Sequence, residues 1–223
     1  MASIRKIVLS DGQIYHVFNR GIDRRTVFTS KKDFDRFQRL IKFYRHKNIP
    51  IRFSQVMQQS EDIRESTLRN IHESERLVDI LTYCIMPNHF HFLLKQNSNN
   101  GIATFISNIT NAYTKYFNTR TKREGPLFQG VFKAVLIESD EQLVHVSRYI
   151  HLNPTTSSII PTEQLNSYLW SSYPEYIKLS NEDISESSFV LGLFKSVKDY
   201  EKFVMDQVEY AKQLDAIKHL ILE

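Results

Sequence analysis

The stretch from residue 77 to residue 95 constrains the fold more than any other part of the chain. Residues 77–86 form a mostly apolar run long enough for a buried strand, and Pro87-Asn88 is a dipeptide typical of tight turns. Phenylalanines then alternate with His89 and His91. Side chains two apart on a strand leave by the same face, so both imidazoles point one way and the apolar side chains the other. The pattern predicts a β-hairpin with two histidines on one face.

The rest of the chain predicts the elements around this hairpin. Alternation predicts a first strand over residues 13–19, and apolar residues at helical spacing predict helices over residues 31–46 and 102–118. A further strand is expected over residues 131–137, followed by a helix over residues 141–153. The order strand, helix, strand, strand, helix, strand is the split βαβ pattern. We therefore expect an α+β, ferredoxin-like fold, with an antiparallel sheet and helices packed on one of its faces.

Local signals predict where the helices begin and end. Ser30 and Ser139 are each followed, three residues later, by an acidic or amide side chain, which is the capping-box pattern of a helix start. The helix after Ser139 is expected to end near Asn153, because Pro154 disfavours a helical conformation at the residue before it. This helix is the one that carries the candidate tyrosine described below.

Three segments give weaker patterns. Residues 51–56 are expected to form a short strand, and residues 58–76 are polar and without a clear period, which indicates an insertion that is helical at most in part. Residues 155–188 are expected to be irregular.

The C-terminal part predicts an extension rather than part of the sheet. Apolar residues at helical spacing from Val197 to Ile221 predict a long helix used for packing or dimerisation. We expect one domain over residues 1–176 and a helical extension over residues 177–223.

Composition bounds the class of protein. The chain has 223 residues with a net charge of +4, which permits a polyanionic partner without requiring one. No apolar run approaches the roughly 20 residues of a membrane span, and the N-terminus lacks the apolar segment of a secretion signal, so we expect a cytoplasmic protein. The single cysteine, Cys84, lies in an apolar run and is predicted to be a small core residue.

Two histidines and a later helix supply a candidate metal site. Tyr149 and Asn153 are four residues apart and therefore share one face of their helix. If that face meets His89 and His91, two nitrogen ligands and one oxygen ligand lie beside a phenol. Such a mixed site suits magnesium, or manganese given the imidazoles, and zinc is not excluded. The competing interpretation is that the histidines are an exposed or hydrogen-bonded pair.

Five motifs in order resemble one known family. The His89-Phe90-His91 run resembles the His-hydrophobic-His motif of single-tyrosine (HUH) transposases. Four further blocks are similar to those of the subgroup called REP-associated tyrosine transposases: residues 19–21, 127–133, 148–154 and 170–173. The resemblance covers about residues 12–176. Val131 departs from it, because relatives often have arginine at that position.

The resemblance implies a function and a set of site residues. Tyr149 would be the nucleophile, and His89, His91 and Asn153 would bind Mg²⁺ or Mn²⁺. The chain would act as a metal-dependent endonuclease and strand transferase on single-stranded, hairpin-associated DNA, through a 5′-phosphotyrosine intermediate. A homodimer is expected, and a monomer is the alternative. Basic residues are candidates for DNA contacts, with solvated charges as the competing interpretation: Arg20, Arg24, Arg25, Arg120, Lys122, Arg123, Lys133 and Arg148.

Two other functions use the same residues. A non-catalytic hairpin-binding regulator would need the basic surface but not Tyr149. A metal-dependent hydrolase would use water, with Tyr149 only structural. Tyr113 and Tyr116 are the competing nucleophiles, but both lie in the apolar stripe of their helix, which favours a packing role.

Overall fold

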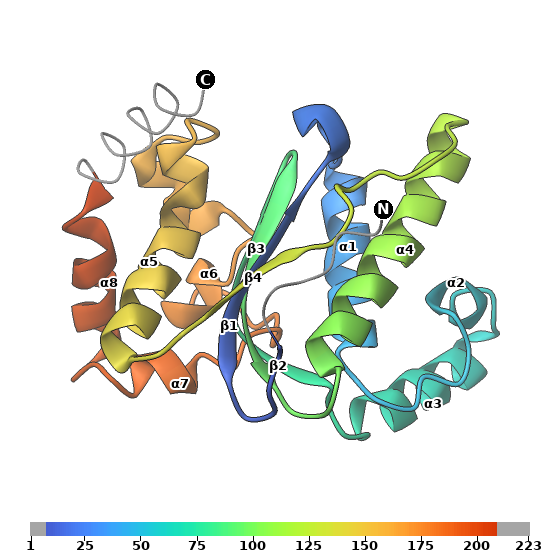
Figure 1. Cartoon of the computed structure of the whole chain (residues 1–223), viewed down its shortest axis with the longest axis horizontal. Helices are drawn as coiled ribbons and strands as arrows, with labels where there is room; N and C mark the ends of the chain where they lie inside the picture. The colour runs from blue at the N-terminus through green and yellow to red at the C-terminus, as the bar shows by residue number, and fades with distance from the viewer. Residues whose placement is uncertain (1–7, 209–223) are drawn as a thin grey trace.

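A four-stranded antiparallel sheet forms the centre of the molecule (Figure 1). The computed structural model describes residues 8–208 of the chain. The strands lie in the order β2-β3-β1-β4, and the two central ones pair along their whole length. Their bounds are β1 Ile14–Arg20, β2 Val78–Met86, β3 His89–Gln96 and β4 Lys133–Leu136. The predicted α+β fold with an antiparallel sheet is confirmed, including the hairpin that turns at Pro87-Asn88.

Helices cover both faces of the sheet, whereas we expected them on one face. Helices α1 (Lys31–Tyr44) and α4 (Gly101–Thr121) pack on one side. On the other side lie α5 (Asp140–Thr156) and α8 (Val197–Met205), with the short helices α6 (Tyr173–Tyr176) and α7 (Ser188–Leu191) (Figure 1). The physical reason is that β2 and β3 are buried on both faces, and a doubly buried sheet needs two covering layers.

The segment after α1 contains short helices instead of the expected strand. Phe53–Val56 forms the single turn α2, and Glu61–His72 forms α3. Phe53 and Val56 are both buried, and a helical turn places residues three apart on one side, whereas a strand would send them to opposite faces. The partly helical segment over residues 58–76 agrees with α3.

The two predicted helix starts differ in chemistry. Ser139 caps α5 as expected, because its Oγ accepts a hydrogen bond from the Gln142 backbone N–H at 3.1 Å. Ser30 precedes α1, but its side chain makes no capping bond. Instead the Asp33 carboxylate accepts bonds from the Thr29 backbone N–H at 2.9 Å and the Thr29 hydroxyl at 2.7 Å. The predicted start of the helix is confirmed, but Asp33 binds Thr29 rather than Ser30.

Helix α5 continues past Pro154 to Thr156, so the predicted end near Asn153 was wrong. A proline within a helix removes one backbone hydrogen bond. In this case the last turn is buried, and Thr155 Oγ donates to the Leu152 carbonyl oxygen at 2.9 Å. Packing of that turn outweighs the local preference and keeps Asn153 in helical geometry.

The chain after α5 covers the exposed edge of β2. Ser172 N–H donates to the Tyr83 carbonyl oxygen at 3.0 Å, and Glu186 N–H donates to the Ile80 carbonyl oxygen at 2.8 Å. An edge strand with unpaired backbone groups would invite aggregation, and this segment satisfies those groups.

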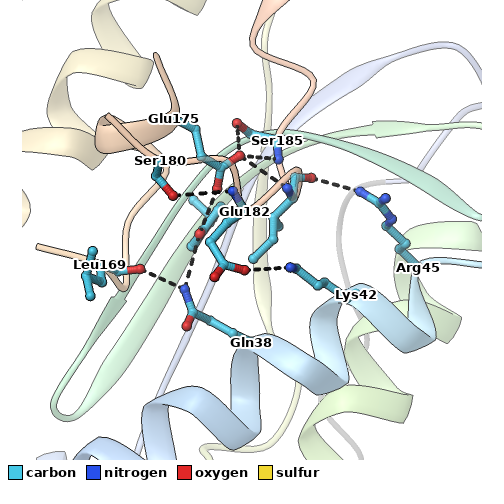
Figure 2. Close-up of polar contacts among 10 residues, drawn as sticks. Gln38, Lys42, Arg45, Leu169, Glu175, Ser180, Glu182 and Ser185 are labelled. Atoms are coloured by element: carbon cyan, nitrogen blue, oxygen red, sulfur yellow. Dashed lines mark hydrogen bonds and ion pairs between the residues drawn. The ribbon is translucent and has the colours of Figure 1, made fainter. Parts of the chain in front are cut away.

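Figure 2 shows how the same segment is tied to α1. Gln38 donates to the Leu169 carbonyl oxygen at 2.8 Å, and Lys42 pairs with Glu182 at 2.5 Å. The carboxylate of Glu175 is buried, and it accepts bonds from the Ser185 backbone N–H and hydroxyl, both at 2.8 Å. These bonds fix the irregular region around a buried charge.

The C-terminal helix is shorter in the described region than we expected. Ser196 caps α8 by accepting a bond from the Asp199 N–H at 3.2 Å, and Tyr200 and Val204 are buried against α5. The predicted stripe beyond Val208 lies outside the described residues. Within residues 8–208, no helix is both long and apolar enough to cross a membrane.

Candidate active site

The β2–β3 hairpin places two imidazoles side by side. His89 pairs with Met86 at the turn, and His91 lies opposite Phe18 of the central strand β1. The two imidazole ring centroids are 4.9 Å apart. Both side chains are nearly buried, with exposed fractions of 9% for His89 and 6% for His91. They leave the sheet on the same face, as the alternation along the strand predicts, and α5 covers that face.

Helix α5 brings a phenol and an amide to these histidines. The Tyr149 ring lies 5.5 Å from the His91 ring between centroids, and the Asn153 side chain lies beside His89. All four residues line one pocket of about 680 Å³. Tyr149 is 39% exposed, so it is the member of the set that a ligand in the pocket can reach from solvent. The structure therefore brings together the four residues singled out in the sequence.

Burial keeps the histidines neutral. The pKa of His89 is lowered to about 4, first by burial and then by the charge of Arg20, while Asn153 opposes the shift because it can accept a hydrogen bond from the charged form. The pKa of His91 lies well below its usual value, because of burial and then the neighbouring histidines. A neutral imidazole has a nitrogen lone pair available for a metal ion.

The donor atoms fit a divalent metal. Asn153 Nδ2 donates to the Tyr149 carbonyl oxygen at 2.8 Å, so the amide oxygen is the atom that faces His89. His89 Nδ1 contacts Asn88 Oδ1 at 2.5 Å, which leaves Nε2 for the Asn153 side. Within residues 8–208, no group of three or more His, Cys, Asp or Glu side chains could hold a metal ion. A metal in this pocket would therefore depend on the amide oxygen as its third protein ligand.

The sequence analysis missed a third histidine in this pocket. His16 lies on β1, and its Nε2 is 2.9 Å from His91 Nδ1, with the two rings stacked 5.1 Å apart between centroids. Such a contact fixes the orientation of His91 and directs its other nitrogen away from β1. The available signal was the alternation along β1, which places His16 on the same face as Arg20.

Three of the eight predicted DNA-contacting cations line the pocket: Arg20, Arg24 and Lys133. The other five lie elsewhere, and four of them make contacts within the protein. Arg25 pairs with Asp23 at 3.0 Å, Arg120 pairs with the buried Asp33 at 2.9 Å, Arg123 donates to the Pro126 carbonyl oxygen at 2.7 Å, and Arg148 donates to the Phe203 carbonyl oxygen at 3.1 Å. Lys122 is exposed at the C-terminal end of α4.

Hydrogen bonds hold the tyrosine-bearing helix from its opposite side. The Tyr200 hydroxyl of α8 lies 2.8 Å from His151 Nδ1 and 3.1 Å from Ser147 Oγ. His151 Nε2 lies 2.7 Å from Ser172 Oγ. These contacts bracket Tyr149 in sequence and limit rotation of α5 about its axis.

The competing tyrosines do not share this pocket. Tyr113 is buried, and its hydroxyl donates to the Val27 carbonyl oxygen at 2.7 Å, while burial raises its pKa. The Tyr116 hydroxyl is 3.2 Å from Asp33 Oδ1. Both side chains belong to the α1–α4 layer, as the packing interpretation predicts.

Comparison with known proteins gives a family match over part of the chain and a shared fold. Residues 52–153 match the family model described as "Transposase IS200 like". The solved structure of a REP-associated tyrosine transposase bound to a REP hairpin is similar, with a TM-score of 0.50 and 13% sequence identity over 82% of this chain and 90% of that chain. At this identity the likeness establishes the fold. No curated protein matches the chain. The partial family match and the shared fold agree with the resemblance that the motifs indicated.

Proposed function

We propose that the chain is a metal-dependent single-stranded DNA endonuclease and strand transferase, which cleaves hairpin-associated DNA through a 5′-phosphotyrosine intermediate and rejoins it. One observation carries the proposal: Tyr149 lies 5.5 Å, between ring centroids, from a histidine of a neutral pair whose second member lies beside Asn153. A nucleophile beside a ready set of metal donors is the arrangement that phosphoryl transfer requires.

The proposed chemistry assigns one task to each group. Mg²⁺ or Mn²⁺ held by His89, His91 and Asn153 would supply Lewis-acid polarisation of the scissile phosphate. Tyr149 Oη attacks the phosphorus, an O–P bond forms, and the bond from phosphorus to the 3′ oxygen breaks. The phenolic proton passes to solvent, since Tyr149 is 39% exposed, and the 3′ oxygen takes a proton from water. The phosphotyrosine ester retains the bond energy, so a 3′-hydroxyl of another strand can reverse the step.

The charged rim of the pocket supports a nucleic-acid substrate. Arg20, Arg24 and Lys133 surround the histidines, and cations of this kind contact phosphate oxygens without reading the base sequence. The similar solved structure carries a REP hairpin, and we propose the same class of ligand for this chain.

The decisive experiment is detection of a covalent adduct. DNA hairpins with a single-stranded flank and a 3′ label are incubated with the protein and Mg²⁺ or Mn²⁺, and the products are separated on a denaturing gel. We expect the label to migrate with the protein, and the band to disappear in Tyr149→Phe but not in the control Tyr113→Phe. Hairpin binding without an adduct in any metal would favour the regulator, and released product without an adduct would favour the hydrolase.

Assembly as a homodimer is part of the proposal. Because Tyr149 lies beside the histidines of its own chain, a monomer would also carry every proposed site residue. Light scattering after gel filtration, with and without the hairpin, separates the two states by mass.

A further inference from the structure

A second and larger pocket lies on the opposite side of the sheet. Residues of α1, α2 and α4 line a groove of about 1150 Å³, and in Figure 1 these three helices lie across the sheet from α5. None of the residues proposed for cleavage lines it. Any ligand of this groove is therefore separated from Tyr149 by the sheet and contributes to binding rather than to chemistry.

The groove is lined by cations and by no carboxylate. Arg36, Arg52, Lys115 and Arg120 line it, and only Arg120 forms an ion pair among the described residues, with Asp33 at 2.9 Å. Three positive charges thus face a shared space without a protein counter-charge. Charges of one sign in a concave surface concentrate ligands of the opposite sign.

Arg36 is the central feature of the groove. Its guanidinium carbon lies 4.5 Å from the centre of the Phe53 ring and 5.3 Å from that of Tyr116, so two aromatic rings hold it in place. Its Nε is buried and has no hydrogen-bond partner in the described structure. A buried donor without an acceptor is costly, and an anion in the groove would supply the missing acceptor.

Helix α4 adds a polar stripe along the groove. Asn108, Asn111, Lys115 and Thr119 recur at helical spacing and all line the groove. From first to last they span roughly 16 Å of helix. Amide, hydroxyl and ammonium groups in a row can contact successive phosphates and base edges of one strand.

We propose that the groove between α1, α2 and α4 is a second nucleic-acid site, which binds an unpaired segment of the DNA substrate. Phosphates lie against Arg36, Arg52 and Lys115. Cations placed beside aromatic rings in a groove are typical of single-strand binding sites, which favours single-stranded DNA. The proposal rests on the proposed function only in that the two sites share one DNA molecule.

The test measures binding and is independent of cleavage. In the Tyr149→Phe background, fluorescence anisotropy compares a blunt hairpin with the same hairpin carrying single-stranded extensions. We expect Arg52→Gln/Lys115→Gln to weaken binding of the extended hairpin about tenfold and to reduce its salt slope by about 1.4, with blunt-hairpin binding unchanged. The control Lys195→Gln/Lys198→Gln removes the same charge from exposed positions at and before α8 and leaves both affinities unchanged.

A second variant tests the same groove if the double variant does not fold. Arg36→Lys retains the charge but loses the Nε donor, and we expect it to weaken binding of the extended hairpin while the melting temperature stays within a few degrees. Equal affinities of variants and control for the extended hairpin would overturn the proposal, as would an equal loss for both hairpins. If a mononucleotide binds the groove and the substitutions leave the affinity for DNA unchanged, the groove is a free-nucleotide site instead. If the groove variants bind both hairpins like the control while the parent protein still forms the adduct, the groove proposal is refuted and the proposed function stands.

Discussion

The two helical layers that cover the sheet share aromatic packing but differ in their buried hydrogen bonds. In the α1–α4 layer the Phe28 ring lies 4.9 Å from both Phe37 and Tyr113 between centroids, and in the α5–α8 layer the Tyr176 ring lies 5.0 Å from Tyr200. Against α5 and α8 buried polar groups meet, such as His151 with Tyr200 and with Ser172. Aromatic packing gives stability that depends on volume. Hydrogen bonds fix direction, and the layer that carries Tyr149 is the one that needs its helix held in one rotation.

The largest expected effect breaks the proposed metal site. His91→Ala removes one nitrogen donor and the partner of His16, so we expect adduct formation to fall to background at all Mg²⁺ and Mn²⁺ concentrations. His145→Ala, at an exposed position of α5, serves as the control and should retain the adduct. Persistence of the adduct in His91→Ala at wild-type metal dependence would contradict the proposed ligand set.

The next effect tests the aromatic layer. Phe37 is fully buried, so Phe37→Ala should lower the free energy of unfolding by about 3–5 kcal/mol. Urea denaturation measures the change. At a temperature where the variant is folded, the adduct rate per folded molecule should be unchanged. A lower rate would mean that the two layers are coupled through the sheet.

A smaller effect tests the polar layer. Tyr200→Phe removes the hydroxyl that contacts His151 and Ser147, and the polar groups left behind should cost about 1–3 kcal/mol of unfolding free energy. We expect a slower adduct rate at saturating DNA with hairpin affinity unchanged, because α5 becomes free to rotate. Tyr176→Phe is the matched control, since its hydroxyl donates to the Leu81 carbonyl oxygen and not to α5. Equal rates in the two variants would refute the positioning role of Tyr200.

The last effect is a pH dependence shared by both layers. Burial lowers the pKa of His46, near the end of α1, to about 4, and burial lowers that of His151 in α5 to about 3. In the unfolded chain both groups titrate near pH 6.5. The unfolded state therefore binds more protons below that pH, so stability is complete above about pH 6.5 and falls as pH drops toward 4. Denaturation midpoints between pH 4 and 8 should show this slope, reduced in His46→Gln.

Local sequence patterns predicted most of the sheet. They were wrong where tertiary packing decides between a strand and a helical turn, or where a helix ends. Alternation along residues 89–94 is unambiguous, because it fixes which side chains share a face. Residues 51–56 are too few for a period to decide, and the structure chooses a helical turn because Phe53 and Val56 are buried together. The prediction of the end of α5 was wrong for a similar reason, because burial of Pro154 in the tertiary structure outweighs its local effect on the helix.

The candidate site could be predicted in part for the same reason. Tyr149 and Asn153 share a helix face by their spacing alone, and so do His89 and His91 on their strand. His16 was not predicted as a site residue, because its contact with His91 joins residues 75 positions apart in sequence, through the pairing of β1 with β3. The same limit applies to Arg120, whose partner Asp33 lies on another helix 87 positions away.

The sequence by itself determined the order of the four strands and of α1, α4 and α5, the sharing of one strand face by the two histidines, and the sharing of one helical face by a phenol and an amide. These follow from periods of two and 3.6 residues, which act over a few neighbours. Only the tertiary structure decided that α5 lies over the histidine face, that His16 supports His91, and that α1, α2 and α4 enclose a cationic groove. Those arrangements depend on which buried surfaces meet, and the spacing of neighbouring residues does not determine packing between distant segments.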